Sequence, residues 1–427
     1  MKLKISRAAS NVFFNSIEGA LFLSGMVFFH QNTILIAFIK KTFDSPVLVA
    51  LIPALLTTGI NLPGILTTRI AEQYPYRKKF ILIFGFIQRM AILLMALSTL
   101  LFVPTGAKAM TGFVLLFYFC FAFSGGVSFP AWIDFYAKTV PLRFRARTTA
   151  IRNALSGVAG ILLPLWIAVI LARESYPANY RQIFLLGFCF LLLSYICFCQ
   201  IREEKASPLS VRQNYHRFLQ SLLGLLRQNK NFRRFLTARL IWCVTACGPA
   251  FYTAYAIDLL RVPDSTVALY TFFLNISIAV SGMILGYIGD KFGNLKIQWI
   301  GAISSTLELL LVIFFPSDLV FKIVFLLYGI SYSANSNAMQ VLTTEFGTDR
   351  DRIRYSTISG FLSGTTYGLI PVLAGVLLSL NIITLPVLFM FCAGCSLLAL
   401  GLYIFTVKDP RSLPVVEEVT GENSLSV

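Results

Sequence analysis

The amino-acid sequence predicts an all-α polytopic membrane protein with twelve transmembrane helices in two pseudo-symmetric six-helix bundles. Three observations lead to this fold class: the composition, the length of the apolar runs and an internal repeat. Of the 427 residues, 57% are hydrophobic and 13% are charged, and the mean hydropathy is +0.75. A soluble fold of this length cannot bury so much apolar surface, so lipid must be the solvent for most of the chain.

Apolar runs of roughly 20 residues recur along the chain, each long enough to cross about 30 Å of hydrocarbon as a helix. Lipid offers the backbone no hydrogen-bond partners, and a helix satisfies its own N–H and C=O groups. The runs are too long and too uniformly apolar for the strands of a membrane barrel. The twelve predicted spans cover residues 12–38, 46–69, 80–103, 110–135, 148–172, 181–201, 235–258, 265–289, 297–315, 319–344, 355–380 and 383–407.

The distribution of Lys and Arg predicts the orientation of these spans. If the N-terminus is cytoplasmic, 26 of the 36 basic residues fall in inside segments and 7 in outside loops. Such a bias in short loops is the positive-inside signal, so both termini are expected in the cytoplasm, with the protein in the cytoplasmic (inner) membrane. Topology then accounts for the net charge of +17, and the dispersed basic residues argue against a nucleic-acid partner.

The longest polar stretch lies between the sixth and seventh predicted spans and divides the chain into two sets of six. Apolar residues recur at helical spacing within it, which indicates an amphipathic linker at the membrane surface. The predicted organisation is an N-terminal bundle at 1–201, a cytoplasmic linker at 202–234, a C-terminal bundle at 235–407 and a flexible cytoplasmic tail at 408–427.

An internal repeat supports this division, because the fifth and eleventh predicted spans align without gaps at a shift of 207 residues. The segment PLRFRARTTAIRNALSGVAGILLP aligns with TDRDRIRYSTISGFLSGTTYGLIP, so that an arginine ladder, an LSG triplet and a proline coincide. Carriers are commonly built from such repeated halves. The matched arginines are Arg143, Arg145 and Arg147 in the first copy and Arg350, Arg352 and Arg354 in the second.

The loops after the second and eighth spans also correspond, as RIAEQYPYRKK and GYIGDKFGNLK. Twelve spans in two halves, with GYIGDKFGNLK after span eight, resemble the major facilitator superfamily, whose signature here is a glycine, an acid, a base, a glycine and further bases. The first copy departs from it at Gln73 and Pro75. The segments around Glu18 and Asp134, EGALFLSGMVFFHQNT and PAWIDFYAKTVP, resemble a bacterial branch of this family.

The resemblance implies a gating motif on the cytoplasmic face. An acid at a helix end, close to arginines of the fifth or eleventh helix, can form charge-assisted hydrogen bonds in one state and release them in the other. We therefore expect Glu72 to bind near Arg147, and Asp290 near Arg354, when the cytoplasmic side is closed. The alternative is that these charges only fix topology and helix ends. The full set is Glu72, Arg77, Arg147, Gly286, Asp290, Lys291, Gly293 and Arg354.

Charges within spans are candidates for a polar site, because each costs roughly 2.5 to 3.5 kcal/mol on insertion scales unless it meets a partner or water. Five such residues are predicted: Glu18, Arg89, Arg152, Arg239 and Glu308. In the superfamily the first, fourth, seventh and tenth helices line the central cavity. The resemblance therefore favours Glu18 and Arg239 over Arg89 and Glu308. For Glu18 the alternative is a structural pair with an arginine, and for Arg239 it is snorkelling to the inner surface.

Spans four, seven and ten supply further polar or aromatic candidates. Span ten reads YGISYSANSNAMQ, the most polar sequence in any span, and such residues suit a wet cavity or helix packing through hydrogen bonds. Pro249 should kink span seven because it removes one backbone hydrogen bond. The predicted substrate or coupling cavity is formed by Glu18, Asn335, Asn337, Tyr332, Tyr252, Trp132 and Arg239.

These features predict a secondary active transporter that moves a small organic solute by alternating access, driven by a gradient. The aromatic residues and few cavity charges favour a neutral or amphipathic solute, and a coupling proton or ion is compatible with them. No cofactor, metal site or catalytic residue is predicted, and the expected form is a monomer in the lipid bilayer. The alternatives are a channel or non-transporting receptor on the same scaffold, or an intramembrane enzyme, for which no HExxH motif appears.

Overall fold

A computed structural model of the chain describes residues 2–72, 74–203, 224, 226, 229–346 and 352–412. The regular secondary structure of these described residues is helical. The N-terminal half contains α1 (Lys2–Val27), α2 (Ile34–Lys40), α3 (Pro46–Glu72), α4 (Arg77–Ser98), α5 (Phe102–Thr139), α6 (Leu142–Arg173) and α7 (Ala178–Gln200). The C-terminal half contains α9 (Lys230–Cys243), α10 (Cys247–Leu260), α11 (Asp264–Phe292), α12 (Asn294–Phe314), α13 (Asp318–Glu345), α14 (Arg352–Ser379) and α15 (Leu385–Phe405).

The predicted twelve-span architecture is confirmed. Eleven helical segments of the described chain are long and apolar enough to cross a membrane. The remaining span is the first, where α1 and α2 follow each other and a turn at 28–33 separates them. This turn contains a run of polar residues, and its backbone is satisfied locally and from the other half: His30 accepts from Leu35, and the Thr253 hydroxyl donates to the Asn32 carbonyl at 2.6 Å.

The seventh span is also interrupted, as Pro249 predicted. A short 3-10 turn, Val244–Ala246, separates α9 from α10, and Pro249 is the third residue of α10. Proline is tolerated in the first turn of a helix, where its missing N–H has no intrahelical partner to lose. The break therefore lies just before the proline and not at it.

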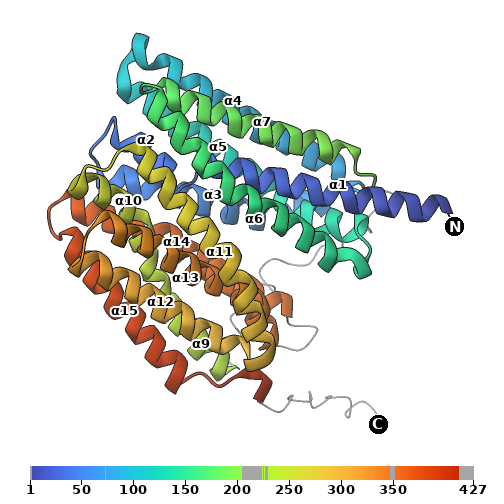
Figure 1. The fold of residues 1–427 in the computed structure, drawn as a ribbon. Coiled ribbons are helices and arrows are strands. Elements are labelled where there is room, and N and C mark those ends of the chain that lie inside the picture. The colour runs from blue at the N-terminus through green and yellow to red at the C-terminus, as the bar shows by residue number, and fades with distance from the viewer. Residues whose placement is uncertain are drawn as a thin grey trace.

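Two helix pairs form the largest contacts between the halves: α3 packs against α14, and α6 packs against α11 (Figure 1). Glycines on α14 bring the first pair close together. A Cβ atom at Gly375 would lie 2.9 Å from the Pro46 carbonyl oxygen, and one at Gly368 would lie 2.7 Å from Thr58 Cγ2. Small residues at a helix crossing are the usual means of close association in lipid, where the hydrophobic effect between helices is absent.

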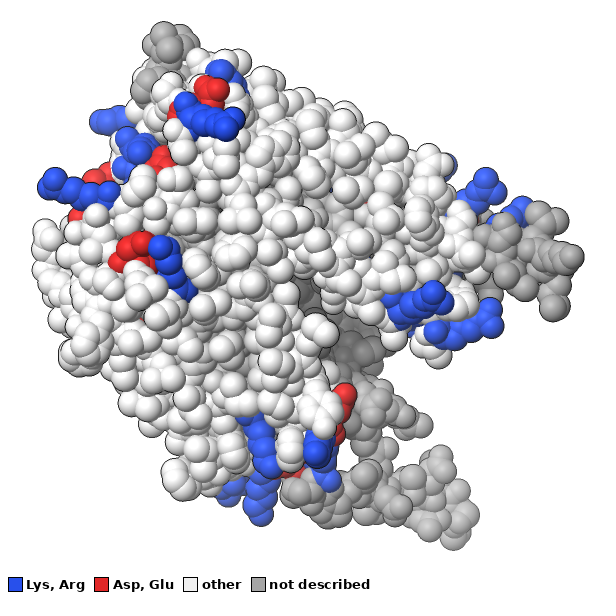
Figure 2. All heavy atoms as spheres, in the orientation of Figure 1, with Lys and Arg blue, Asp and Glu red and all other residues white. Residues whose placement is uncertain are grey.

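The two bundles converge at one end of the molecule and diverge at the other, where α1 begins and α15 ends (Figure 1). Figure 2 shows a hollow between the halves on this open side. Basic side chains stand mostly alone there and are mixed with acidic ones at the converging end. The predicted linker at 202–234 and tail at 408–427 lie largely outside the described residues, so the division into four segments stays a prediction.

Gly126 gives a test of packing within the N-terminal half. A Cβ atom there would overlap the Gly59 carbonyl oxygen and lie 2.6 Å from the Ile60 carbonyl oxygen, both backbone atoms of α3. We expect Gly126→Ala to destabilise the protein by about 1 to 3 kcal/mol, because α3 and α5 must separate. Thermal unfolding in detergent measures the effect. The control is Gly112→Ala on the same helix, where a Cβ atom meets open space, and an equal loss in both variants would contradict the prediction.

Candidate functional site

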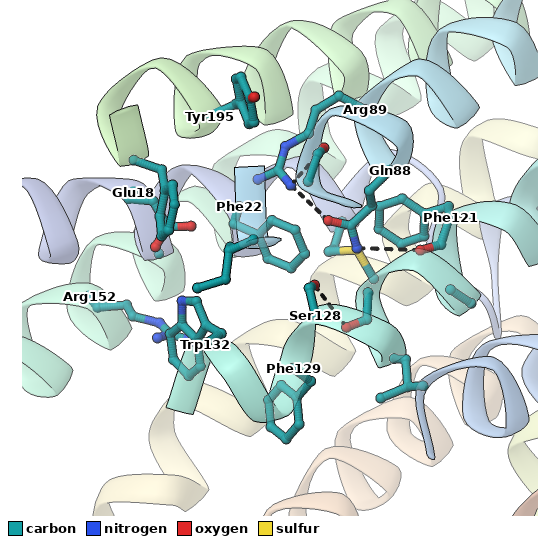
Figure 3. Close-up of a pocket in the computed structure, with 18 residues that line it drawn as sticks. Glu18, Phe22, Gln88, Arg89, Phe121, Ser128, Phe129, Trp132, Arg152 and Tyr195 are labelled. Carbon is teal, nitrogen blue, oxygen red and sulfur yellow. Dashed lines mark hydrogen bonds between the residues drawn. The ribbon is translucent and has the colours of Figure 1, made fainter. Parts of the chain in front are cut away.

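A cavity of about 220 Å³ lies inside the N-terminal half, and we call it the N-half cavity (Figure 3). It is lined by α1, α3, α4, α5, α6 and α7, and most of its wall is aromatic or aliphatic. Five polar or charged groups line it among these apolar side chains: Glu18, Gln88, Arg89, Ser128 and Arg152.

Glu18 of α1 is 7% exposed and faces this cavity, which is separate from the cavity that Arg239 and Asn335 line. Ser194 Oγ donates to Glu18 Oε1 at 3.4 Å and accepts from Arg89 Nη2 at 3.4 Å. No ion pair of Glu18 occurs among the described residues, although Arg89 and Arg152 both act on it electrostatically. The direct pair with an arginine, which was the alternative interpretation, is therefore not seen among the described residues, although Arg89 and Arg152 line the same cavity.

Arg89 of α4 is held by neutral acceptors. Its guanidinium donates to Gln88 Oε1 at 2.7 Å, to the Gly85 carbonyl at 3.2 Å and to the Leu191 carbonyl at 3.3 Å. It also lies 5.4 Å from the ring centroids of Phe22 and Tyr195. The expectation that placed Glu18 in the cavity ahead of Arg89 has no geometric basis, because both side chains line the same space.

Trp132 of α5 lines the N-half cavity, and the Arg152 guanidinium lies over its ring at 5.3 Å from the centroid (Figure 3). Gly19 leaves room for this arginine, since a Cβ atom there would lie 2.6 Å from Arg152 Nε. The sequence identified Arg152 as an intramembrane charge but not as a site residue. The ring that it contacts, Trp132, belongs to another helix, and no local sequence pattern reveals that contact.

A second cavity, of about 340 Å³, lies between the two halves, and we call it the interface cavity. The N-terminal half contributes Gln31, Asn32, Pro53, Thr57 and Asn61, and the C-terminal half supplies the remaining lining residues. It contains the most polar stretch of α13 together with parts of α9, α12 and α14.

Arg239 of α9 is 1% exposed and lines the interface cavity, so the snorkelling alternative is wrong. Its Nε donates to Ser363 Oγ at 2.8 Å, and its Nη2 donates to Asn335 Oδ1 at 2.8 Å. Asn335 Nδ2 in turn donates to the Tyr367 hydroxyl at 2.6 Å. These bonds fix a polar wall contributed by three helices, and Tyr332 lies on the same wall with 46% of its surface exposed.

The residues predicted to form one cavity are divided in the structure: Glu18 and Trp132 line the N-half cavity, while Arg239, Asn335 and Tyr332 line the interface cavity. Tyr252 is fully buried and lines neither cavity, because its ring packs against Phe325 and Phe389. Its hydroxyl lies beside the carboxyl of Glu308, which does line the interface cavity and which the sequence analysis ranked below Arg239. The side chain of Asn337 lies outside the described residues.

The interface cavity is closed at the converging end by contacts between the halves. Lys40 pairs with Asp258 at 2.6 Å and Lys41 with Asp264 at 3.1 Å. Between these ion pairs and the cavity, Asn32 Nδ2 donates to the Tyr328 hydroxyl at 2.9 Å, and the Thr271 hydroxyl donates to Thr33 Oγ1 at 2.7 Å. The turn between α1 and α2 and the end of α2 thus form one side of a gate.

The predicted gating motif lies at the opposite, open end. Gly293 separates α11 from α12 at φ +93°, a conformation that favours glycine. Asp290 and Arg147 are exposed, and no ion pair of either occurs among the described residues. Lys291 lies 5.3 Å from the Phe292 ring centroid, and Gly286 is exposed. The side chains of Glu72 and Arg354 lie outside the described residues.

Arg77 of the same motif is buried and makes contacts within the N-terminal half. Its Nε pairs with Asp134 at 2.9 Å, and its backbone N–H donates to Glu203 Oε1 at 3.0 Å. Lys138 joins both carboxylates, at 3.1 Å from Asp134 and 3.2 Å from Glu203. These contacts tie α4 and α5 to the segment after α7, within the N-terminal half.

Comparisons with known proteins place this geometry in context. A family model described as Major Facilitator Superfamily matches residues 18–347 and 248–426. The structure of a D-xylose–proton symporter is 14% identical, covers 95% of this chain and 99% of its own, and superposes with a TM-score of 0.72. The nucleoside transporter NupG is 11% identical, with 94% and 99% coverage and a TM-score of 0.66.

The xylose transporter XylE from E. coli, in an inward-open conformation, is 14% identical and covers 93% of this chain and 96% of its own, with a TM-score of 0.68. At these identities the structural likeness establishes a shared fold. A sequence comparison with curated proteins gave no match.

The gate at the converging end gives a test by charge reversal. We expect Lys41→Asp or Asp264→Lys to weaken the closed end by up to about 1 kcal/mol, roughly a fivefold change in the ratio of closed to open molecules, because a partly exposed ion pair contributes about that much. The double reversal should restore the ratio. Pulsed electron spin resonance distances between spin labels on α2 and α10 report it.

The matched control is Lys322→Asp, which breaks an ion pair with Asp318 inside one half. It should leave the distance distribution unchanged. A distribution that responds equally to Lys322→Asp, or that stays the same in every variant, would show that the Lys41–Asp264 pair does not hold the halves together.

Proposed function

Because this chain belongs to the major facilitator superfamily and is a secondary transporter that works by alternating access, we propose that it carries a small organic solute across the cytoplasmic membrane through the space between its two halves. The supporting observation is a polar cavity that both halves line, closed at one end by ion pairs and reached from a hollow at the other. A central site with one closed end is what alternating access requires.

The proposed orientation places both termini in the cytoplasm. The excess of Lys and Arg in the segments at the open end supports this assignment through the positive-inside rule. The described conformation is then inward-facing, with α2 and α10 closing the outer end. Reorientation must break the contacts of Lys40 and Lys41 and form new ones at the opposite end.

We assign those new contacts to the gating motif. Asp290 and Arg147 are exposed in a conformation whose cytoplasmic end is open, which agrees with a latch that has been released. The pairing expected from the sequence, Glu72 with Arg147 and Asp290 with Arg354, joins residues of the same half. Because α3 packs against α14 and α6 packs against α11, Glu72 would instead bind the arginines near Arg354 in the outward-facing state, and Asp290 those near Arg147. Each pair gains charge-assisted hydrogen bonds only when the halves close on the cytoplasmic side.

Solute recognition is proposed for two surfaces that face the transport path. In the interface cavity, Arg239, Asn335 and Tyr332 present donors and acceptors that are already oriented by Ser363 and Tyr367. In the N-half cavity, Glu18 and Trp132 face the same space. A small organic solute agrees with the cavity volumes and with the D-xylose and nucleoside transporters to which the fold is similar.

Glu308 is proposed as the site of a coupling proton. It lines the interface cavity at 1% exposure, its Oε2 has no hydrogen-bond partner, and no ion pair of Glu308 occurs among the described residues. A buried carboxylate without a cation is costly, so the group must bind a proton whenever it is shielded from water. Reorientation would expose it alternately to the two sides.

A channel, a receptor and an intramembrane enzyme were the alternatives. The family and the structurally similar proteins are transporters and not enzymes. A closed end sealed by several contacts between the halves argues against a continuous pore. Saturable counterflow separates a carrier from a channel or a receptor, since only a carrier exchanges internal for external solute through one site.

The transport proposal predicts counterflow in proteoliposomes for solutes selected by a thermal-shift screen of metabolites and drugs. Tyr332→Phe removes one cavity hydroxyl without changing the ring, and we expect the KM for counterflow to rise about 2- to 10-fold, as loss of one hydrogen bond of 0.5–1.5 kcal/mol implies. Tyr287→Phe, on the exposed surface of α11, is the control and should leave KM unchanged. Absence of saturable counterflow for every selected solute would contradict the proposal.

The coupling proposal predicts that Glu308→Gln separates exchange from accumulation. The amide cannot release a proton, so solute accumulation driven by a proton gradient should fall to the level of passive equilibration, while counterflow continues. Glu174→Gln, at an exposed position after α6, should retain both activities. Normal gradient-driven accumulation by Glu308→Gln would rule out this residue as the coupling site and leave the carrier function intact.

A further inference from the structure

The N-half cavity contains a cation whose donors are not used by the protein. Arg152 forms no hydrogen bond or ion pair with the described residues, and its Nε is buried without a partner. Its guanidinium is oriented by the Trp132 ring beneath it. An arginine held by an aromatic face keeps its planar donors free for a ligand.

Arg89, the other arginine of this cavity, is different because its donors are occupied. Gln88, Ser194 and two backbone carbonyls accept from it. The only acid that lines the cavity is Glu18, so the described lining carries two positive charges against one negative charge. A single negative charge on a ligand would bring this buried site to neutrality, which is the favourable condition in a medium of low polarity.

Apart from Gln88, Ser128 and Tyr195, the remaining wall of the N-half cavity is mostly apolar. Phe22, Phe121, Phe129 and Met26 line the cavity, and Figure 3 shows Phe121 across the space from Arg152, beside Gln88. At about 30 Å³ for each water molecule in the liquid, 220 Å³ corresponds to roughly seven waters, a volume suited to a small solute. A doubly charged anion would leave this site with uncompensated negative charge, and a neutral solute would leave one positive charge uncompensated.

We propose that the N-half cavity binds the carboxylate of a small amphipathic monoanion, with Arg152 donating to the carboxylate and the aromatic wall holding the apolar body. This inference rests on the proposed transport function and names its substrate class. The sequence allowed a neutral or an amphipathic solute. The excess positive charge of the cavity lining favours the amphipathic anion over a neutral solute. Arg152 is thereby assigned as the residue that selects for charge.

The test uses three carboxylates, each with its neutral amide: benzoate and benzamide, phenylacetate and phenylacetamide, and indole-3-acetate and indole-3-acetamide. Binding to the purified full-length protein is measured by isothermal titration calorimetry. We expect at least one carboxylate to bind wild-type protein more tightly than its amide. Arg152→Gln should weaken carboxylate binding roughly 10- to 100-fold, as loss of a charge-assisted hydrogen bond implies, and should leave amide binding unchanged.

Two further variants separate recognition from folding. Arg173→Gln removes an exposed arginine at the far end of the same helix and should retain the preference for carboxylates. Arg152→Lys keeps the charge but not the planar donors, and should restore part of the preference that Arg152→Gln loses. A preference that survives in Arg152→Gln, or wild-type protein that does not distinguish any carboxylate from its amide, including by binding none of the six, would overturn the inference.

Counterflow of the bound carboxylate distinguishes this inference from the transport proposal. Wild-type protein that binds a carboxylate through Arg152 but gives no counterflow of it would support the site and contradict its place on the transport path. Counterflow restricted to neutral solutes, with rates equal in wild type and Arg152→Gln, would support transport and overturn the charge selection.

Discussion

Polar and ionised groups inside the hydrocarbon layer need partners or water within the protein, and this constraint organises both halves of the molecule. Arg89 meets it with carbonyls and an amide of neighbouring helices, and Arg239 meets it with Ser363 and Asn335. Each arrangement draws partners from two or three helices. The polar groups therefore lie where helices converge, and the cavities form around them instead of at the lipid surface.

The sequence predicts the fold well because the signals that define it are local. Length and hydropathy of each run identify a helix in lipid whatever its neighbours are, and the repeat around Arg147 and Arg354 is visible by alignment alone. The break before Pro249 was also predictable, since proline acts on its own helix. The turn that divides the first span was not, because FFHQNT is stabilised there by Thr253 and Thr271 of the other half.

The candidate site was predictable only in part, for the same physical reason. Glu18, Trp132, Arg239 and Asn335 carry polarity that is unusual for a span and line the cavities. Pairings across helices determine the rest, and a single sequence does not show them. Tyr252 has the aromatic ring and hydroxyl expected of a residue that lines a cavity, yet its ring packs in the core.

The end of α2 has a consequence for how easily the molecule changes shape. Lys40 contacts two carboxylates at once: Asp258 across the interface, and Asp44 four residues further along the chain, after the end of α2. When the halves part there, the ammonium group keeps a negative neighbour that travels with it. Separation therefore leaves the ammonium group paired, and the carboxylate that loses its cation, Asp258, is already 47% exposed and can be hydrated, which lowers the barrier to switching.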